Sequence, residues 1–145
     1  MKALKTLFAA GCLLAAGASL AAENSLRFGL EALYPPFESK SASGKLEGFD
    51  IELGDAVCAA AQLQCSWVET SFDSLIPALK FKKYDAVISG MDITPERSKQ
   101  VAFTDPYYAN SALVIAKKDA FHSFDDLKGK RIGMENGTTH QKYLQ

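Results

Sequence analysis

The feature that most constrains the fold is an alternation between short apolar segments with strand character and longer segments with helical spacing. The strand-like segments are 26–30, 64–69 and 85–88, and the third is apolar from Ala86 onward, as strands buried on both faces of a parallel sheet are. Between them, apolar residues recur at helical spacing after Asp50 and again after Asp73. This order predicts an α/β fold built on a parallel sheet.

Polar and proline residues set the expected boundaries of these elements. Asp50 is the candidate N-cap of the first helix, and Asp73 is expected to open the second. Thr94 is expected to cap a short third helix that has Pro95 at its first position. Prolines at 35 and 36 exclude a regular helix or a central strand just after the first strand, and the polar segment 39–48 indicates a hairpin or loop.

The last third of the chain continues the same pattern. We expect a strand at 111–116, long enough to leave one domain and enter another, and a helix at 124–130 that stops at Gly129. A new strand is expected at 131–134, followed by a helix beyond Thr139.

The N-terminus is typical of a secretory signal peptide. Lys2 and Lys5 precede an apolar run from 7 to 20, and small residues follow, so cleavage after Ala21 or Ala22 is expected and residues 1–22 are left out of the fold. The run is short for a membrane span, which needs about 20 apolar residues. A lipid-modified Cys12 is an alternative, although the sequence before it matches a lipoprotein site poorly.

Charge and cysteine content exclude several classes of function. Removal of the signal leaves 14 basic and 17 acidic residues, without the basic patch of a nucleic-acid-binding protein. Cys58 and Cys65 form an even pair in an exported chain, which favours a disulfide over two buried thiols. A metal site is not expected because His122 and His140 are remote from them, and no cofactor is expected.

Four segments are expected at the carboxyl ends of the strands, where open α/β sheets bind ligands: 31–37, 72–73, 89–97 and 137–140. Arg97 offers a planar fork for a carboxylate, and backbone N–H groups around 90–92 and 137–139 are expected to assist it. Glu31 and Asp92 supply negative charge, and Tyr34 and Phe72 supply ring faces. Together they suit a zwitterion with a cationic tail.

Each of these residues also has a purely structural interpretation. The two aromatic residues fit a core, Arg97 and Glu31 fit a solvated surface, and Asp92 fits a turn cap. The prediction of a site therefore depends on the set and on no single member.

The motifs YPPFE at 34–38, GFDIEL at 48–53, FDSLIPAL at 72–79, YDA at 84–86, ITPER at 93–97 and GKRIG at 129–133 occur in one order. This closely resembles the polar amino-acid-binding proteins of ABC uptake systems, over residues 23–145. The resemblance implies a two-lobed α/β fold of the periplasmic-binding-protein type, with an incomplete first lobe at 23–112 and, at 113–145, a crossover strand and a truncated second lobe. It also implies a monomer in the periplasm that gives its ligand to an inner-membrane permease.

The resemblance assigns roles to individual positions. It implies that Arg97 and Thr139 bind the ligand α-carboxylate, and that Ser89, Gly90 and Met91 line the site, with Gly90 acting through its backbone. Glu31 would meet a cationic side chain between the rings of Tyr34 and Phe72. Asp92 stands where related binders have serine, and a Cys58–Cys65 disulfide is implied. In this family, the acidic residue that binds the α-amino group of the ligand lies at a position beyond Gln145.

The ligand implied is L-arginine or a related cationic amino acid, because segments 91–98 and 134–143 look like those of arginine binders. Lysine, ornithine and histidine stay open as ligands. The same fold resembles periplasmic dehydratases, so an enzyme is the second hypothesis, with Glu31 and His140 as the tempting acid–base residues. Neither has a nucleophile or metal partner near it in sequence, and we expect no catalysis. A receptor sensor domain is the third hypothesis.

Overall fold

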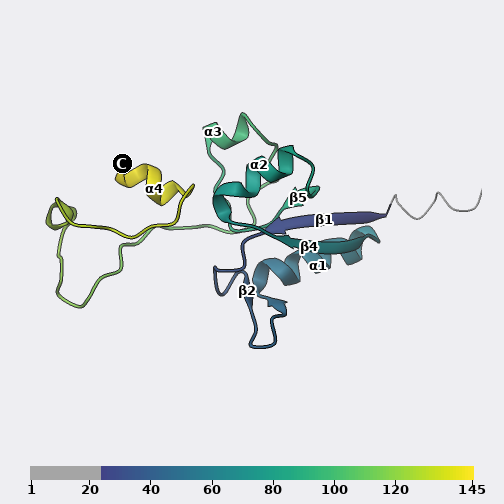
Figure 1. Ribbon diagram of the computed structural model, residues 1–145, viewed down its shortest axis with the longest axis horizontal. Helices are drawn as coiled ribbons and strands as arrows, with labels where there is room; N and C mark the ends of the chain where they lie inside the picture. Colours follow the sequence, from purple (N-terminus) through teal and green to yellow (C-terminus); the bar gives the residue numbers. More distant parts are fainter. Residues whose placement is uncertain (1–23) are drawn as a thin grey trace, which may run out of the picture.

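The computed structural model describes residues 24–145, so the expected signal peptide and Cys12 lie outside the described part. Its centre is a three-stranded parallel sheet in the order β4-β1-β5 (Figure 1). The strands are β1 (Ser25–Leu30), β4 (Gln64–Glu69) and β5 (Ala86–Val87). β1 pairs with β4 along its whole length and with β5 only at Phe28 and Gly29. The predicted parallel α/β sheet is confirmed.

Helices cover both faces of this sheet. α1 (Phe49–Ala61) lies on one face, and the 3₁₀ turn η1 (Phe72–Ser74) leads into α2 (Leu75–Lys80) on the other (Figure 1). Leu30 of β1 is buried with Ile51 of α1, whereas Leu75 of α2 is buried with Tyr84. Gly29 faces the Tyr84 ring so closely that an added Cβ would meet it. Each face of β1 thus has its own small core.

The hairpin is confirmed, but the start of the first helix is corrected. β2 (Ser39–Lys40) pairs antiparallel with β3 (Leu46–Glu47). α1 begins after Gly48, which has φ 126° and lies against the carbonyl of Phe37, where a Cβ has no room. Asp50 is therefore inside the first turn and is not the N-cap. Its side chain is buried and accepts hydrogen bonds from other segments instead.

Two short helices each begin directly after a threonine. α3 (Pro95–Ser98) starts after Thr94, whose hydroxyl accepts a hydrogen bond from the backbone N–H of Arg97 at 3.2 Å. α4 (Thr139–Leu144) starts after Thr138, which accepts from the N–H of Gln141 at 3.3 Å. The predicted Thr94 cap is confirmed, and so is a helix that begins at Thr139.

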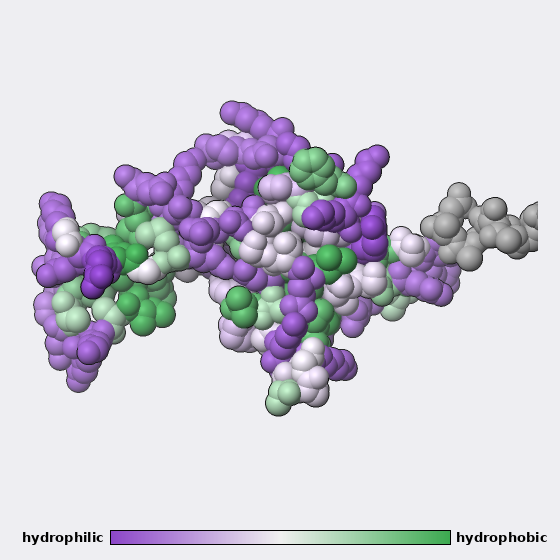
Figure 2. All heavy atoms as spheres, viewed as in Figure 1, coloured by the Kyte–Doolittle hydropathy of each residue, from purple (hydrophilic) through white to green (hydrophobic). Residues whose placement is uncertain are grey.

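The predicted strands at 111–116 and 131–134 are wrong. Neither segment has secondary structure, and neither forms a ladder with another strand of residues 24–145. Leu113 and Ile115 expose 85% and 92% of their surface, and Figure 2 shows apolar residues gathered on this extended part of the chain. The helix expected at 124–130 is only a 3₁₀ turn, η2 (Phe124–Leu127).

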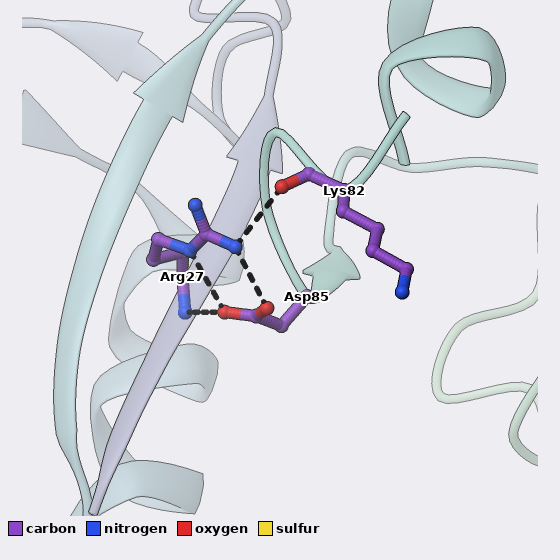
Figure 3. A network of polar contacts seen from close by, with 3 residues as sticks. All are labelled: Arg27, Lys82 and Asp85. Atoms are coloured by element: carbon purple, nitrogen blue, oxygen red, sulfur yellow. Dashed lines mark hydrogen bonds and ion pairs between the residues drawn. The ribbon is translucent and has the colours of Figure 1, made fainter. Parts of the chain in front are cut away.

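A paired arginine and aspartate hold β5 against β1 (Figure 3). The guanidinium of Arg27 donates to both carboxylate oxygens of Asp85, at 3.0 and 2.9 Å, and to the carbonyl of Lys82. Hydrogen bonding from Arg27 lowers the pKa of Asp85 to about 2. This contact ties the chain just before β5 to β1.

A disulfide joins the end of α1 to β4. Cys58 and Cys65 are bonded, with their Cα atoms 6.1 Å apart, which confirms the pairing. Within residues 24–145, no helix is long and apolar enough to cross a bilayer. The same residues contain no cluster of His, Cys, Asp and Glu that fits a metal ion.

Candidate ligand-binding site

A charged cavity of about 120 Å³ lies where the segments after β1 and β5 meet η1 and the start of α4. All four segments predicted from the sequence contribute to it. Its lining is Glu31, Tyr34, Glu38, Phe72, Ser89, Gly90, Asp92, Arg97, Asn110, Glu135, Thr138, Thr139 and His140. A second hollow of about 660 Å³ shares part of this lining and runs beside β5, but it is lined mainly by uncharged residues. The smaller cavity therefore holds most of the ionic chemistry.

Arg97 is the buried cation of this cavity. It exposes only 9% of its surface, and two of its N–H groups donate to backbone carbonyls, of Asp92 at 2.7 Å and of Gly137 at 2.9 Å. Its guanidinium lies 5.4 Å from the centre of the Phe72 ring. Burial lowers its pKa, but an arginine stays charged. Because a guanidinium has five N–H donors, some remain for an anionic ligand.

The loop after β5 is held by acids behind it. The Ser89 hydroxyl donates to Glu38 at 2.6 Å and accepts from the N–H of Glu31 at 3.0 Å. The N–H of Gly90 donates to Asp50 at 3.0 Å. The expectation that Gly90 presents an exposed N–H is therefore wrong. The backbone group of Gly90 that is left for a ligand is its carbonyl. Met91 lines the larger hollow and packs on the core beneath α2.

Asp92 and Gly137 fasten the later part of the chain to the sheet. The Thr139 hydroxyl donates to the carboxylate of Asp92 at 2.6 Å. Gly137, at φ 77°, comes so close to Asp73 that an added Cβ would lie 3.0 Å from its Cα. An exposed ion pair between Lys142 and Glu96 adds a further link at 2.7 Å. These contacts bring residues 135–140 to the cavity, as the sequence predicted for 137–140.

Two glutamates form an acidic end of the cavity. Glu31 accepts a hydrogen bond from the backbone N–H of Phe72 at 3.1 Å. The carboxyl group of Glu135 hydrogen bonds with that of Glu31, and this contact, with partial burial, raises the pKa of Glu135 to about 7. Below pH 7 the pair thus keeps a proton. The sequence reasoning missed Glu135, although it lies just before a segment predicted to reach the site.

The two predicted aromatic walls are both present. Phe72 is half-buried, with its ring beneath Arg97, and it also packs against the core under α2. Tyr34 stacks on Phe37, with ring centres 5.2 Å apart, and exposes 41% of its surface. Phe72 therefore serves both as a core residue and as a cavity wall, while Tyr34 belongs to the cavity.

Two buried acids were also missed as site residues from the sequence: Glu38, which lines the cavity, and Asp50, which binds the cavity residue Gly90. Glu38 exposes 1% of its surface and Asp50 none, and the Tyr107 hydroxyl donates to Asp50 at 3.0 Å. Burial, together with the charge of Asp50, raises the pKa of Tyr107. The sequence did contain a signal for Glu38. It is an acid that directly follows the apolar motif Tyr34-Pro35-Pro36-Phe37, where a charged residue is unexpected.

Comparisons with known proteins show the family of the chain. Residues 26–139 match the family of bacterial extracellular solute-binding proteins, family 3. The ABC transporter arginine-binding protein 1 of Escherichia coli K12 is 61% identical over 98% of this chain and 58% of its own length. The lysine/arginine/ornithine-binding periplasmic protein of the same organism is 44% identical over 89% of this chain and 50% of its own length.

A solved structure is also similar to this chain. A Salmonella typhimurium periplasmic binding protein, described as having high arginine specificity, has a TM-score of 0.81 and 56% sequence identity. The match covers 83% of this chain and 55% of the solved one. The chain thus spans about half the length of the relatives it matches.

Proposed function

The chain belongs to the bacterial extracellular solute-binding proteins of family 3, and we propose that it binds L-arginine or a related cationic amino acid for delivery to an ABC permease. Among its relatives are proteins named for arginine and for lysine, arginine and ornithine. The chain covers 58% and 50% of the length of these two relatives, so the ligand and the permease are both proposals.

One observation carries the proposal: Phe72 contacts both charged ends of the cavity. Its ring lies under the Arg97 guanidinium, and its backbone N–H binds Glu31, which in turn meets Glu135. A donor fork and an acid pair on either side of one residue match a ligand with a carboxylate and a cationic side chain. A neutral amino acid would pair with Arg97 but has no side-chain cation for the acids.

The wider assignment follows from this role. We place the protein in the periplasm as a monomer, divided at 23–112 and 113–145, with no cofactor and no nucleic acid as a partner. Support for a binding protein over an enzyme comes from the two candidate acid–base residues. Glu31 is held by Phe72 and Glu135, and His140 has no hydrogen-bonded nucleophile within the described chain.

The test is calorimetric titration of the refolded chain with L-arginine, L-lysine, L-ornithine, L-histidine and L-glutamine. We expect the permanently cationic ligands to bind more tightly than glutamine. Arg97→Ala should abolish measurable binding, whereas Arg131→Ala, an exposed arginine outside the cavity, should leave it unchanged. Equal affinity for glutamine and arginine would contradict the proposal.

A further inference from the structure

Two carboxyl groups, that of Glu38 in the lining of the ligand cavity and that of Asp50 next to it, lie almost completely buried without a cation beside them in residues 24–145. Glu38 exposes 1% of its surface, and Asp50 in the first turn of α1 exposes none. None of the ion pairs formed by residues 24–145 includes either acid. Burial of an unpaired carboxylate is costly, so the pair requires another form of compensation.

The hydrogen bonds around the pair leave one carboxyl oxygen of each acid without a donor. One oxygen of Glu38, Oε1, accepts from Ser89, and one oxygen of Asp50, Oδ2, accepts from the Gly90 N–H and the Tyr107 hydroxyl. The remaining oxygens, Glu38 Oε2 and Asp50 Oδ1, are buried and have no donor among the described residues. The two carboxyl groups contact each other, so a single proton between these oxygens satisfies both.

The surroundings indicate which acid carries the proton. Asp50 accepts from two donors on one oxygen, which favours its ionised form, while Glu38 accepts from one. Burial first, and then Asp50, raises the pKa of Glu38 to about 9. The other titratable groups that face the pair are Glu31, after β1, and Tyr107, on the segment that leaves the sheet.

We propose that Glu38 and Asp50 form a proton-sharing pair that positions Ser89 and Gly90 at the ligand cavity. Glu38 holds the Ser89 hydroxyl, which in turn accepts from the N–H of Glu31, and Asp50 holds the N–H of Gly90. The pair thereby joins the segments after β1 and β5 to the start of α1. The positioning role rests on the proposed function, whereas the shared proton does not.

The proton is tested first without any ligand. In the chain labelled with ¹³C, the side-chain carboxyl signal of Glu38 is followed by NMR from pH 4 to 10, and Glu38→Gln assigns it. We expect the signal to stay that of a neutral acid through pH 7 and to change above it. A change centred near the ordinary value of 4.5 would overturn the shared proton.

Stability gives a second ligand-free measurement. The folded pKa of Glu38 is above its unfolded value of 4.5, so its contribution is complete below pH 4.5, declines as pH rises and is gone above about 9. In Glu38→Gln, the amide donates to Asp50 at every pH. The melting temperature of the parent chain should therefore fall relative to that of Glu38→Gln between pH 5 and 9. Parallel profiles would contradict the proposal, and Glu47→Gln, an exposed acid of β3, is the control expected to follow the parent.

Ligand affinity tests the positioning. Glu38→Gln should keep arginine affinity within about twofold at pH 7, because its amide group can accept from Ser89 and donate to Asp50. Glu38→Met fills similar space without either bond and should weaken affinity at least tenfold. Parent-like affinity in Glu38→Met would overturn the positioning role. If Glu38→Met does not fold, a tenfold loss in Glu38→Gln would overturn it instead. A parent chain that binds no amino acid would contradict the proposed function, while the NMR and melting experiments would still decide whether the proton is shared.

Discussion

Arg97 is buried, yet its direct hydrogen bonds go to carbonyl groups and not to a carboxylate. The carbonyls of Asp92 and Gly137 orient the guanidinium but neutralise no charge. The Asp92 carboxylate lies near enough to favour the charged form, but it is bonded to the hydroxyl of Thr139. An arginine already engaged with an acid by two hydrogen bonds, as Arg27 is with Asp85, would have less to offer a ligand. The cavity thus keeps its cation oriented and available.

The first prediction concerns this fork. Arg97→Lys keeps the charge but loses the planar arrangement that binds a carboxylate through two hydrogen bonds and spans two carbonyls. We expect arginine affinity to fall at least tenfold by calorimetry, since disruption of a buried charge pair costs about 2 to 5 kcal/mol. The matched change Arg131→Lys, at an exposed site, should have no effect. Unchanged affinity in Arg97→Lys would show that Arg97 acts only as a point charge.

The second prediction concerns the proton on Glu135. Its pKa is raised to about 7 by the contact with Glu31, and a cationic ligand requires both carboxyl groups to be ionised. Arginine binding should therefore release a proton below pH 7, so affinity should rise from pH 5 to pH 8 and then level off. Glu135→Gln should flatten this profile in calorimetric titrations. His140 lines the same cavity, so His140→Gln, which should retain the profile, is the control.

At the scale of elements, the sequence predicted the features that depend on residues close together in the chain. The apolar segments that become strands, the 39–48 hairpin and the Thr94 cap are each set by residues near one another in the chain, and all are present. Asp50 was mistaken for a cap because its true partners, Gly90 and Tyr107, are far along the sequence. The strand at 111–116 failed for a related reason: apolar spacing predicts a strand, but only a neighbouring strand can complete it.

The same limit explains which site residues were found. Glu31, Phe72 and Arg97 carry their chemistry in their own side chains and in their places after strands, so the sequence was enough to bring them together. Glu38 and Glu135 matter only through the acids they meet, Asp50 and Glu31. No local sequence pattern predicts such a pair.

The third prediction concerns the link between α1 and β4. The Cys58–Cys65 disulfide closes a short loop, for which the chain-entropy relation gives about 2 to 3 kcal/mol of stabilisation. Cys58→Ala/Cys65→Ala should lower the urea midpoint by a corresponding amount while leaving the slope nearly unchanged. Two free thiols in mass spectra of chain isolated from the periplasm would show that the bond does not form there.

At the scale of the whole molecule, the described chain leaves apolar surface open beside its site. β5 contributes two paired residues at one edge of the sheet, and the hollow of about 660 Å³ lies open beside it. Segment 111–116 leaves Leu113 and Ile115 in solvent. Such surfaces favour association with other chains. Amino-acid binding by this chain therefore has to be measured at low concentration and checked for a monomeric state.

The last prediction compares the arginine affinity of this chain with that of a longer relative. We expect the 145-residue chain to bind L-arginine at least a hundredfold more weakly than the longer arginine-binding protein 1 of Escherichia coli, of which it matches 58%. Ligand pockets commonly occupy about 300 to 1,000 Å³ and bury roughly 70 to 90% of a small ligand, whereas the charged cavity here measures about 120 Å³.

The α-amino group provides the second reason for weak binding. Glu31 and Glu135 are assigned to the side chain, and Asp92 is bonded to Thr139, so no acid lining the cavity is left for the ammonium except the protonated Glu38. The loss of one charge-assisted hydrogen bond of about 1.5 to 3 kcal/mol already weakens binding roughly tenfold to hundredfold. Equilibrium dialysis of both proteins with labelled arginine measures the ratio. Equal affinities would show that residues 24–145 hold the complete site.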